Sequence, residues 1–186
     1  MPASEDENAG ADRELLDIPV DTQTEWLEAD GLGGFASGTT SGVRTRRYHA
    51  LLLSAARPPS DRFVLVNGFV GWIETEDGRE DFTPQHYAPG ITTKAPARIV
   101  EFKAEPWPTW RFCTQSGVEF TQEIIAQRGS PKVLLRFRLL SGAKARLVVR
   151  PLLSGRDFHH LQRENSTFDF TPTVRGQSIT FSPYSG

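Results

Sequence analysis

The sequence contains almost no cysteine and no excess of charge of one sign. Its 186 residues include a single cysteine, Cys113, and carry a formal net charge of -2. One cysteine cannot form an internal disulfide, and a nearly neutral chain lacks the concentrated positive surface that attracts nucleic acid or anionic lipid. We therefore expect a cytoplasmic protein that has neither a nucleic acid nor a membrane as its partner.

Long hydrophobic runs are also missing. No apolar segment approaches the roughly 18 residues expected of a membrane-spanning helix. The first 17 residues are instead rich in acidic side chains, and they lack the basic flank and apolar stretch of a signal peptide. We predict that residues 1–17 form a flexible acidic tail and that residues 18–186 form a single domain.

The sequence also shows little helical periodicity. Apolar residues mostly alternate with polar ones, and 16 glycines and 13 prolines interrupt nearly every segment. In residues 132–152, two alternating runs flank a short Ser-Gly-Ala-Lys turn, which predicts a β-hairpin. About a dozen such runs along the chain predict an all-β fold, an antiparallel sandwich or barrel.

A glycine-rich segment, residues 30–49, carries the most distinctive polar residues. Its glycines match the permissive part of a dinucleotide-binding fingerprint, but no helical pattern follows them and no lysine stands at the phosphate-loop position. The segment ends in Arg46, Arg47, Tyr48 and His49. On a strand, successive residues face opposite ways, so we expect Arg46 and Tyr48 on one side of the sheet.

Other chemistries find less support in the sequence. Histidine and aspartate within residues 156–160 do not reach the three or four ligands of a zinc site, so we expect no metal and no cofactor. Ser37 and Cys113 lack the surroundings of a catalytic nucleophile. No spacing pairs two carboxylates for glycoside hydrolysis, and we expect no catalytic residue in this chain.

Four tryptophans are candidates for sugar contacts, because aromatic rings lie well against the apolar faces of glucose. Trp26 and Trp72 lie in alternating segments and are expected in the core. Trp107 and Trp110 flank a proline, and we expect them at a rim.

Three segments together resemble a known family. They are EWLEADGLGGFASGTTSGVRTRRYHALLLSA from residue 25, PPSDRFVLVNG from residue 58 and PLLSGRDFHHL from residue 151. In this order they are similar to the N-terminal domain of the bacterial and archaeal type of glycogen debranching enzyme, the amylo-α-1,6-glucosidase family. Ala50 departs from the glycine expected there, and Val70 with Gly71 departs from an expected acidic pair.

The resemblance implies an antiparallel β-supersandwich, similar to galactose mutarotase and to the N-terminal domains that precede glucoamylase-like catalytic domains. It also implies an (α/α)6 barrel in the same polypeptide, which carries the catalytic carboxylates and hydrolyses α-1,6-glucosidic branch points of glycogen. Because this chain has no helical pattern of that size, we expect it to be the N-terminal part of a longer enzyme.

Our leading hypothesis is a non-catalytic domain that supports the catalytic barrel and borders the α-glucan site. The residues expected at the substrate or at the domain interface are polar or aromatic: Asp30, Arg46, Arg47, Tyr48, His49, Trp107, Trp110, Arg156, Asp157 and His160. Two alternatives stay open. One is an autonomous carbohydrate-binding module for maltooligosaccharide or glycogen. The other is a mutarotase-like sugar-modifying enzyme that uses His49 or His160 as general acid or base.

Overall fold

The computed structural model describes residues 20–87, 91–93, 95–142, 144–163 and 166–184. Every secondary-structure element in these ranges is a β-strand, and the strands pair in antiparallel sheets. The prediction of an all-β sandwich is therefore confirmed. The described ranges hold no helix that is long and apolar enough to cross a membrane. The predicted acidic tail, residues 1–17, lies outside them.

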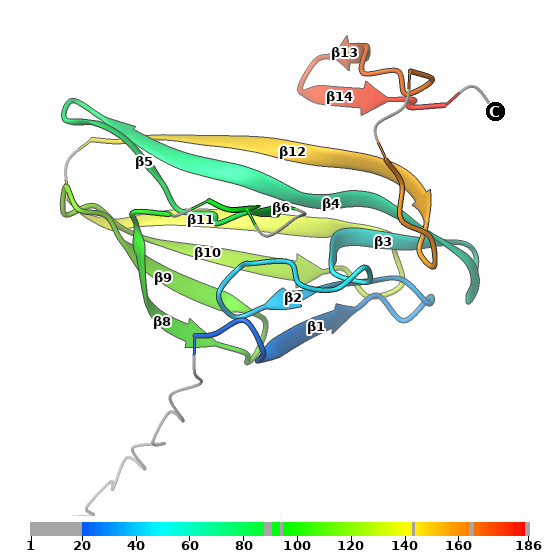
Figure 1. The fold of residues 1–186 in the computed structure, drawn as a ribbon, viewed down its shortest axis with the longest axis horizontal. Helices are drawn as coiled ribbons and strands as arrows, with labels where there is room; N and C mark the ends of the chain where they lie inside the picture. The colour runs from blue at the N-terminus through cyan, green and yellow to red at the C-terminus, as the bar shows by residue number, and fades with distance from the viewer. Residues whose placement is uncertain (1–19, 88–90, 94, 143, 164–165, 185–186) are drawn as a thin grey trace, which may run out of the picture.

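The larger sheet has six strands in the order β1-β2-β3-β4-β12, with β5 also paired to β4 (Figure 1). The strands are β1 (Glu25–Ala29), β2 (Phe35–Thr39), β3 (Ala50–Arg57), β4 (Ser60–Thr75), β5 (Gly78–Asp81) and β12 (Arg146–Asp157). β12 follows one edge of the long strand β4, while β3 and β5 pair with its other edge.

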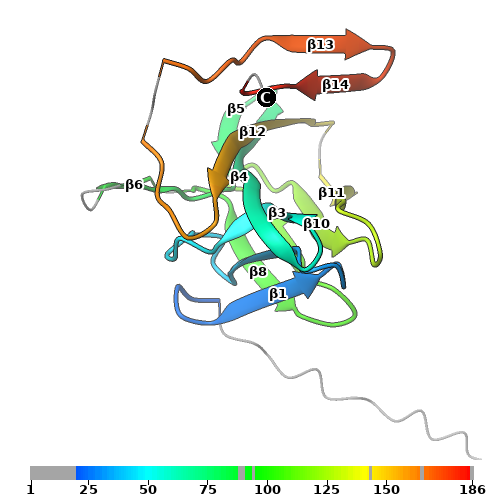
Figure 2. The same cartoon turned by 90° about the vertical axis from the view of Figure 1, so that its right-hand side faces the viewer.

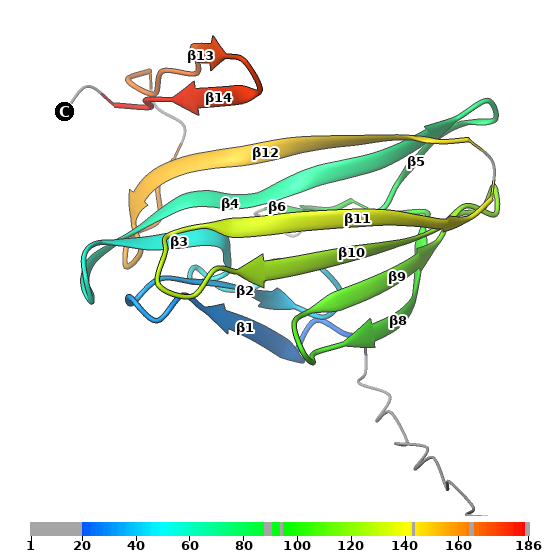
Figure 3. The ribbon, with the colours of Figure 1, turned by 180° about the vertical axis from the view of Figure 1, so that it is seen from behind.

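A four-stranded sheet in the order β11-β10-β9-β8 forms the second layer (Figure 3). Its strands are β8 (Arg98–Lys103), β9 (Thr109–Cys113), β10 (Glu119–Ala126) and β11 (Val133–Ser141). Two short pairs complete the fold: β6 (His86–Tyr87) with β7 (Ile91–Thr92), and β13 (Pro172–Arg175) with β14 (Ser178–Phe181). The β13–β14 hairpin lies outside both layers (Figure 2).

The core between the two sheets is strongly aromatic. Phe82, which follows β5, is 1% exposed. Four phenylalanine rings surround it at centroid distances of 5.1 to 6.2 Å: Phe69, Phe112, Phe120 and Phe137. Gly71 permits this approach, because a Cβ atom at that position would lie 2.2 Å from Cζ of Phe82.

Two tryptophans tie the end of β2 to the core. Trp26 and Trp110 pack edge to face at 5.4 Å, and their indole N–H groups donate to the carbonyl oxygens of Thr39 (3.2 Å) and Thr40 (2.7 Å), respectively. Trp26 thus occupies the core as predicted. The prediction that Trp110 stands at a rim is wrong, because it shares the inward face of β9 with Phe112 and is 2% exposed.

Residues 132–152 do not form the predicted β-hairpin. β11 pairs with β10 in the smaller sheet, whereas β12 pairs with β4 in the larger one. The connection between β11 and β12 therefore carries the chain from one layer to the other. Alternation shows which face of each strand is buried, but it does not show which strand lies alongside.

Candidate functional site

The segment between β2 and β3 ends in a turn at residues 46–49, which we call the Arg46–His49 turn. The N–H group of His49 donates to the carbonyl oxygen of Arg46 at 3.1 Å, and β3 begins only at Ala50. The prediction that these residues lie on a strand, with Arg46 and Tyr48 on one face, is wrong. The N–H group of His49 bonds within the turn, and the carbonyl oxygens of Arg47 and Tyr48 accept hydrogen bonds from the side chains of Arg156 and Ser37.

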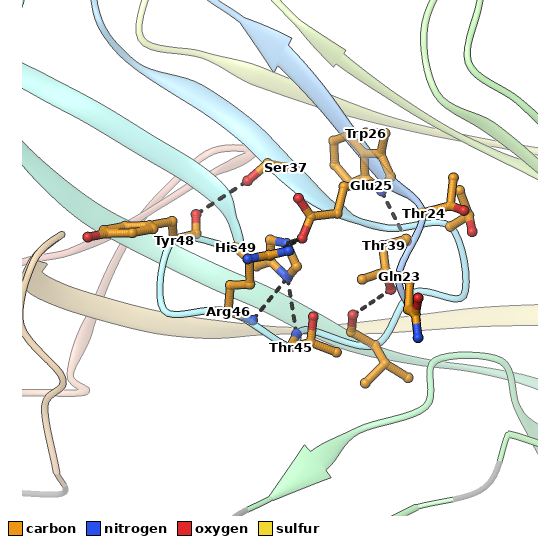
Figure 4. Close-up of polar contacts among 12 residues, drawn as sticks. Gln23, Thr24, Glu25, Trp26, Ser37, Thr39, Thr45, Arg46, Tyr48 and His49 are labelled. Carbon is orange, nitrogen blue, oxygen red and sulfur yellow. Dashed lines mark hydrogen bonds and ion pairs between the residues drawn. The ribbon is translucent and has the colours of Figure 1, made fainter. Parts of the chain in front are cut away.

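His49 is the buried centre of this turn. Its side chain is 4% exposed, and Nδ1 accepts hydrogen bonds from the N–H groups of Thr45 (3.1 Å) and Arg46 (3.3 Å) (Figure 4). Nε2 lies 3.1 Å from a carboxylate oxygen of Glu25. Because Nδ1 is occupied as an acceptor, the proton of the neutral ring sits on Nε2 and is donated to Glu25. Burial lowers the pKa of His49, and the nearby Glu25 only partly offsets this effect.

Acidification is expected to destabilise the protein through His49. An unfolded histidine takes up a proton near about pH 6.5, whereas folded His49 takes it up only at lower pH. Between these values the unfolded state binds more protons, so the free energy of unfolding falls as the pH falls. Chemical denaturation between about pH 7 and about pH 5 should show this slope, and His49→Gln should reduce it.

The matched control for this measurement is His160→Gln, because the His160 side chain is 81% exposed. That variant should keep the slope that His49 produces. An unchanged slope in His49→Gln would contradict a buried, neutral ring at this position.

Glu25 connects His49 to the exposed part of the turn. Its carboxylate also accepts a hydrogen bond from Nε of Arg46, whose side chain is 63% exposed (Figure 4). The Arg46 contact is the main cause that lowers the pKa of Glu25, with a smaller effect from His49. Since exposed ion pairs add little stability, the principal effect of this pair is to orient the Arg46 guanidinium group.

Arg156, near the end of β12, binds the turn to the loop that follows. Its side chain is buried, and its guanidinium group donates to main-chain carbonyl oxygens on both segments: Arg47, Asp157, Phe158 and His160. Two stretches that are far apart in the sequence are therefore held together by one side chain.

Tyr48 and Asp157 complete the outer side of the site. The ring of Tyr48 packs against Phe158 at 5.6 Å, and its carbonyl oxygen accepts a hydrogen bond from Ser37 (Figure 4). The Asp157 carboxylate accepts the N–H group of His159 at 2.8 Å and lies 3.4 Å from Nδ1 of His160. The structure thus brings most of the predicted residues into one region: Arg46, Arg47, Tyr48, His49, Arg156, Asp157 and His160.

Three predicted residues have other positions. The buried carboxylate of Asp30 accepts the N–H groups of Leu32 (2.7 Å) and Gly34 (2.9 Å), so it holds the β1–β2 connection. Trp110 is part of the core and is 2% exposed. Trp107 is half-buried beside Arg136, whose guanidinium carbon lies 5.9 Å from the ring centroid.

Two residues of the site, Glu25 and Arg44, were not predicted from the sequence. Glu25 lies close to His49 because β1 pairs with β2 and β2 pairs with β3. Arg44 donates to the amide oxygen of Gln85 and passes over Gly68 of β4, where a Cβ atom would lie 2.2 Å from Nη1 of Arg44. A glycine inside a strand is the signal that was available, because it often marks the close approach of another group.

The Arg46–His49 turn contributes to two hollows in the surface. One has a volume of about 400 Å³ and is lined partly by Glu25, Arg46, Tyr48 and His49. The other has a volume of about 750 Å³, and Arg46 and His49 also line it. Both volumes lie in the range of roughly 300–1,000 Å³ that is usual for small-molecule sites. Within the described part of the chain, no three His, Cys, Asp or Glu side chains gather in a way that could hold a metal ion.

Comparison with known proteins gives one match. The family model described as "Glycogen debranching enzyme N terminal" matches residues 24–186, which include the turn, β12 and the loop after β12. No curated protein and no solved structure matches the chain significantly.

Proposed function

The chain belongs to the glycogen debranching enzyme N-terminal family, and from this premise we propose that it is a non-catalytic domain that supports a catalytic barrel and borders an α-glucan site. Hydrolysis of α-1,6-glucosidic branch points is then the reaction of the whole enzyme, with its carboxylates in the barrel. The observation that carries the proposal is the Arg46–His49 turn, in which a buried His49 supports the exposed Arg46 and Tyr48.

A recognition surface needs exposed groups on a rigid support. His49 and Arg156 are buried and make hydrogen bonds to the turn or its neighbours, so they fix the backbone of the turn. Arg46, Arg47 and Tyr48 then present two guanidinium groups and a ring to solvent. Guanidinium groups suit the oxygen atoms of a neighbouring domain, and a tyrosine ring suits the apolar face of glucose.

The two alternative functions receive less support from the geometry. An autonomous binding module was expected to use Trp107 and Trp110, and Trp110 is in the core. A mutarotase-like enzyme was expected to use His49 or His160. Both nitrogen atoms of His49 are occupied within the domain, and the exposed His160 faces Asp157.

The proposal predicts that the turn affects debranching by the longer enzyme that contains this domain. The double variant Arg46→Ala/Tyr48→Ala should lower kcat/KM for a branched α-glucan by about tenfold, because two exposed contacts to substrate or barrel are lost. The thermal unfolding of this domain should change little, since both side chains are exposed. Steady-state kinetics on a branched dextrin would measure the effect.

Arg57→Ala is a matched control for the arginine in that experiment. Like Arg46, Arg57 is exposed and pairs with one nearby carboxylate, but its partner is Asp61 at the start of β4. This control should leave kcat/KM unchanged. Wild-type kinetics and wild-type thermal stability of the longer enzyme carrying the double variant would refute the proposed role.

A further inference from the structure

Arginine dominates the larger hollow, which we call the arginine cleft. Its lining contains five arginines, Arg44, Arg46, Arg47, Arg156 and Arg163, and no aspartate or glutamate from the described part of the chain. These residues come from the segment before β3, from the end of β12 and from the chain after β12, which bends past β3 before it reaches β13 (Figures 1 and 2). Positive charge from three segments is therefore concentrated in one cleft.

Within the part of the chain that the structure describes, three of these arginines donate hydrogen bonds only to neutral groups. Arg44 donates to the side-chain amide oxygen of Gln85, and Arg47 donates to the main-chain carbonyl oxygen of His159. Arg156 donates to main-chain carbonyl oxygens alone. Their charges thus lack the carboxylate partner that Arg46 has in Glu25.

Asp157 is the acid that acts on Arg156 from nearby, but its carboxylate is engaged elsewhere. It accepts the N–H group of His159 and faces His160. Arg156 is 9% exposed and Arg44 is half-buried, and burial lowers the pKa of both guanidinium groups. A buried cation without a counter-charge is unfavourable, and an anion in the cleft would relieve that cost.

We propose that the arginine cleft binds a phosphorylated monosaccharide, with its phosphate held by Arg44, Arg47 and Arg156. A guanidinium group presents a planar pair of donors that matches two phosphate oxygens. The volume of about 750 Å³ accommodates more than a phosphate group, and Phe168 and Phe170 contribute apolar rings to the lining. Such rings suit the face of a sugar.

Neutral polar side chains complete the lining of the cleft. Asn67 of β4, Ser154 of β12 and Gln162 can donate to and accept from sugar hydroxyl groups. A sugar phosphate would use the guanidinium groups, these polar groups and the aromatic rings, whereas inorganic phosphate would use the guanidinium groups alone. This site is additional to the proposed contact with a neutral α-glucan and does not depend on it.

Titration calorimetry of the 186-residue chain with glucose 6-phosphate, inorganic phosphate and glucose tests the proposal. We expect glucose 6-phosphate to bind with a dissociation constant of about 1 mM or lower, inorganic phosphate to bind more weakly and glucose to give no measurable heat. Arg47→Gln removes an exposed charge and should weaken binding of glucose 6-phosphate by about tenfold or more. Arg44→Gln should act in the same direction.

Arg57→Gln is the control for net charge, because this exposed arginine lies outside the cleft, and it should bind glucose 6-phosphate as the wild type does. The proposal is overturned if the wild type shows no saturable binding of glucose 6-phosphate, or if Arg47→Gln and Arg44→Gln both bind it with wild-type affinity. If inorganic phosphate bound as tightly as glucose 6-phosphate, the proposed contacts of the cleft with the sugar would be refuted. None of these outcomes bears on debranching kinetics, so failure here and failure of the proposed function are distinguishable.

Discussion

Replacement of Phe82 by alanine is expected to lower the free energy of unfolding by about 3–5 kcal/mol. Phe82 is 1% exposed and its ring contacts the rings of four other phenylalanines from both sheets. The substitution removes buried apolar surface and leaves a cavity that the surrounding β-sheets can only partly close. Equilibrium denaturation with urea would measure the loss.

Phe170→Ala is the matched control, because Phe170 is 66% exposed. Its free energy of unfolding should stay within about 0.5 kcal/mol of the wild type. A loss below about 1 kcal/mol in Phe82→Ala would mean that the two layers do not depend on this ring for their packing.

Replacement of Arg156 by alanine is expected to lower the free energy of unfolding by about 2–4 kcal/mol. The guanidinium group of Arg156 satisfies carbonyl oxygens of the Arg46–His49 turn and of the loop after β12, and its removal leaves them without this donor. The two segments should then separate. Hydrogen exchange of the His49 N–H group, which is bonded inside the turn, should become faster.

Two further variants separate the shape of Arg156 from its charge. Arg156→Lys keeps the charge but not the planar fork, so its stability should lie between those of the wild type and Arg156→Ala. Arg146→Ala is the control on the same strand, because the Arg146 side chain is 79% exposed and should contribute little. Equal stability of Arg156→Ala and Arg146→Ala would exclude the anchoring role of Arg156.

The strands were predictable from the sequence, and their partners were not. Alternation in residues 132–152 locates β11 and β12 correctly, because a strand that covers a core must present apolar residues at every second position. The two strands nevertheless lie in different sheets. Which strand lies alongside depends on contacts between distant parts of the chain, and a short polar turn fits a crossing between layers as well as it fits a hairpin.

The tryptophans show which local signal was more reliable. Trp26 and Trp72 were expected in the core from alternation. Trp26 packs there, whereas Trp72 is buried outside the core cluster, against the guanidinium groups of Arg79 and Arg150. Trp110 was expected at a rim because prolines precede it, yet residues 109–113 alternate between half-buried and buried positions. For Trp110, the alternation of buried and half-buried positions predicted its location better than the nearby prolines did. Alternation reflects packing against the second sheet, whereas proline restricts only the local backbone.

The polar residues of the site were recognised, but their local structure was not. Arg46, Arg47, Tyr48 and His49 read as a strand because nothing in their order signals a turn. The turn is stabilised because Nδ1 of His49 accepts hydrogen bonds from two backbone N–H groups and Arg156 donates one to the Arg47 carbonyl oxygen. A side chain more than a hundred positions away thus helps to decide the conformation, and a pattern within the segment cannot contain that information.

The close approach of Arg44 to Gly68 couples the residue types that these two positions can hold. A methyl group on residue 68 and the guanidinium group of residue 44 would compete for the same space, so a side chain at 68 requires that guanidinium group to move or to be replaced. Descendants of this chain that gain a side chain at 68 must shorten residue 44 or move it aside. A side chain at position 68 is therefore expected mainly in relatives whose residue 44 is shorter than arginine.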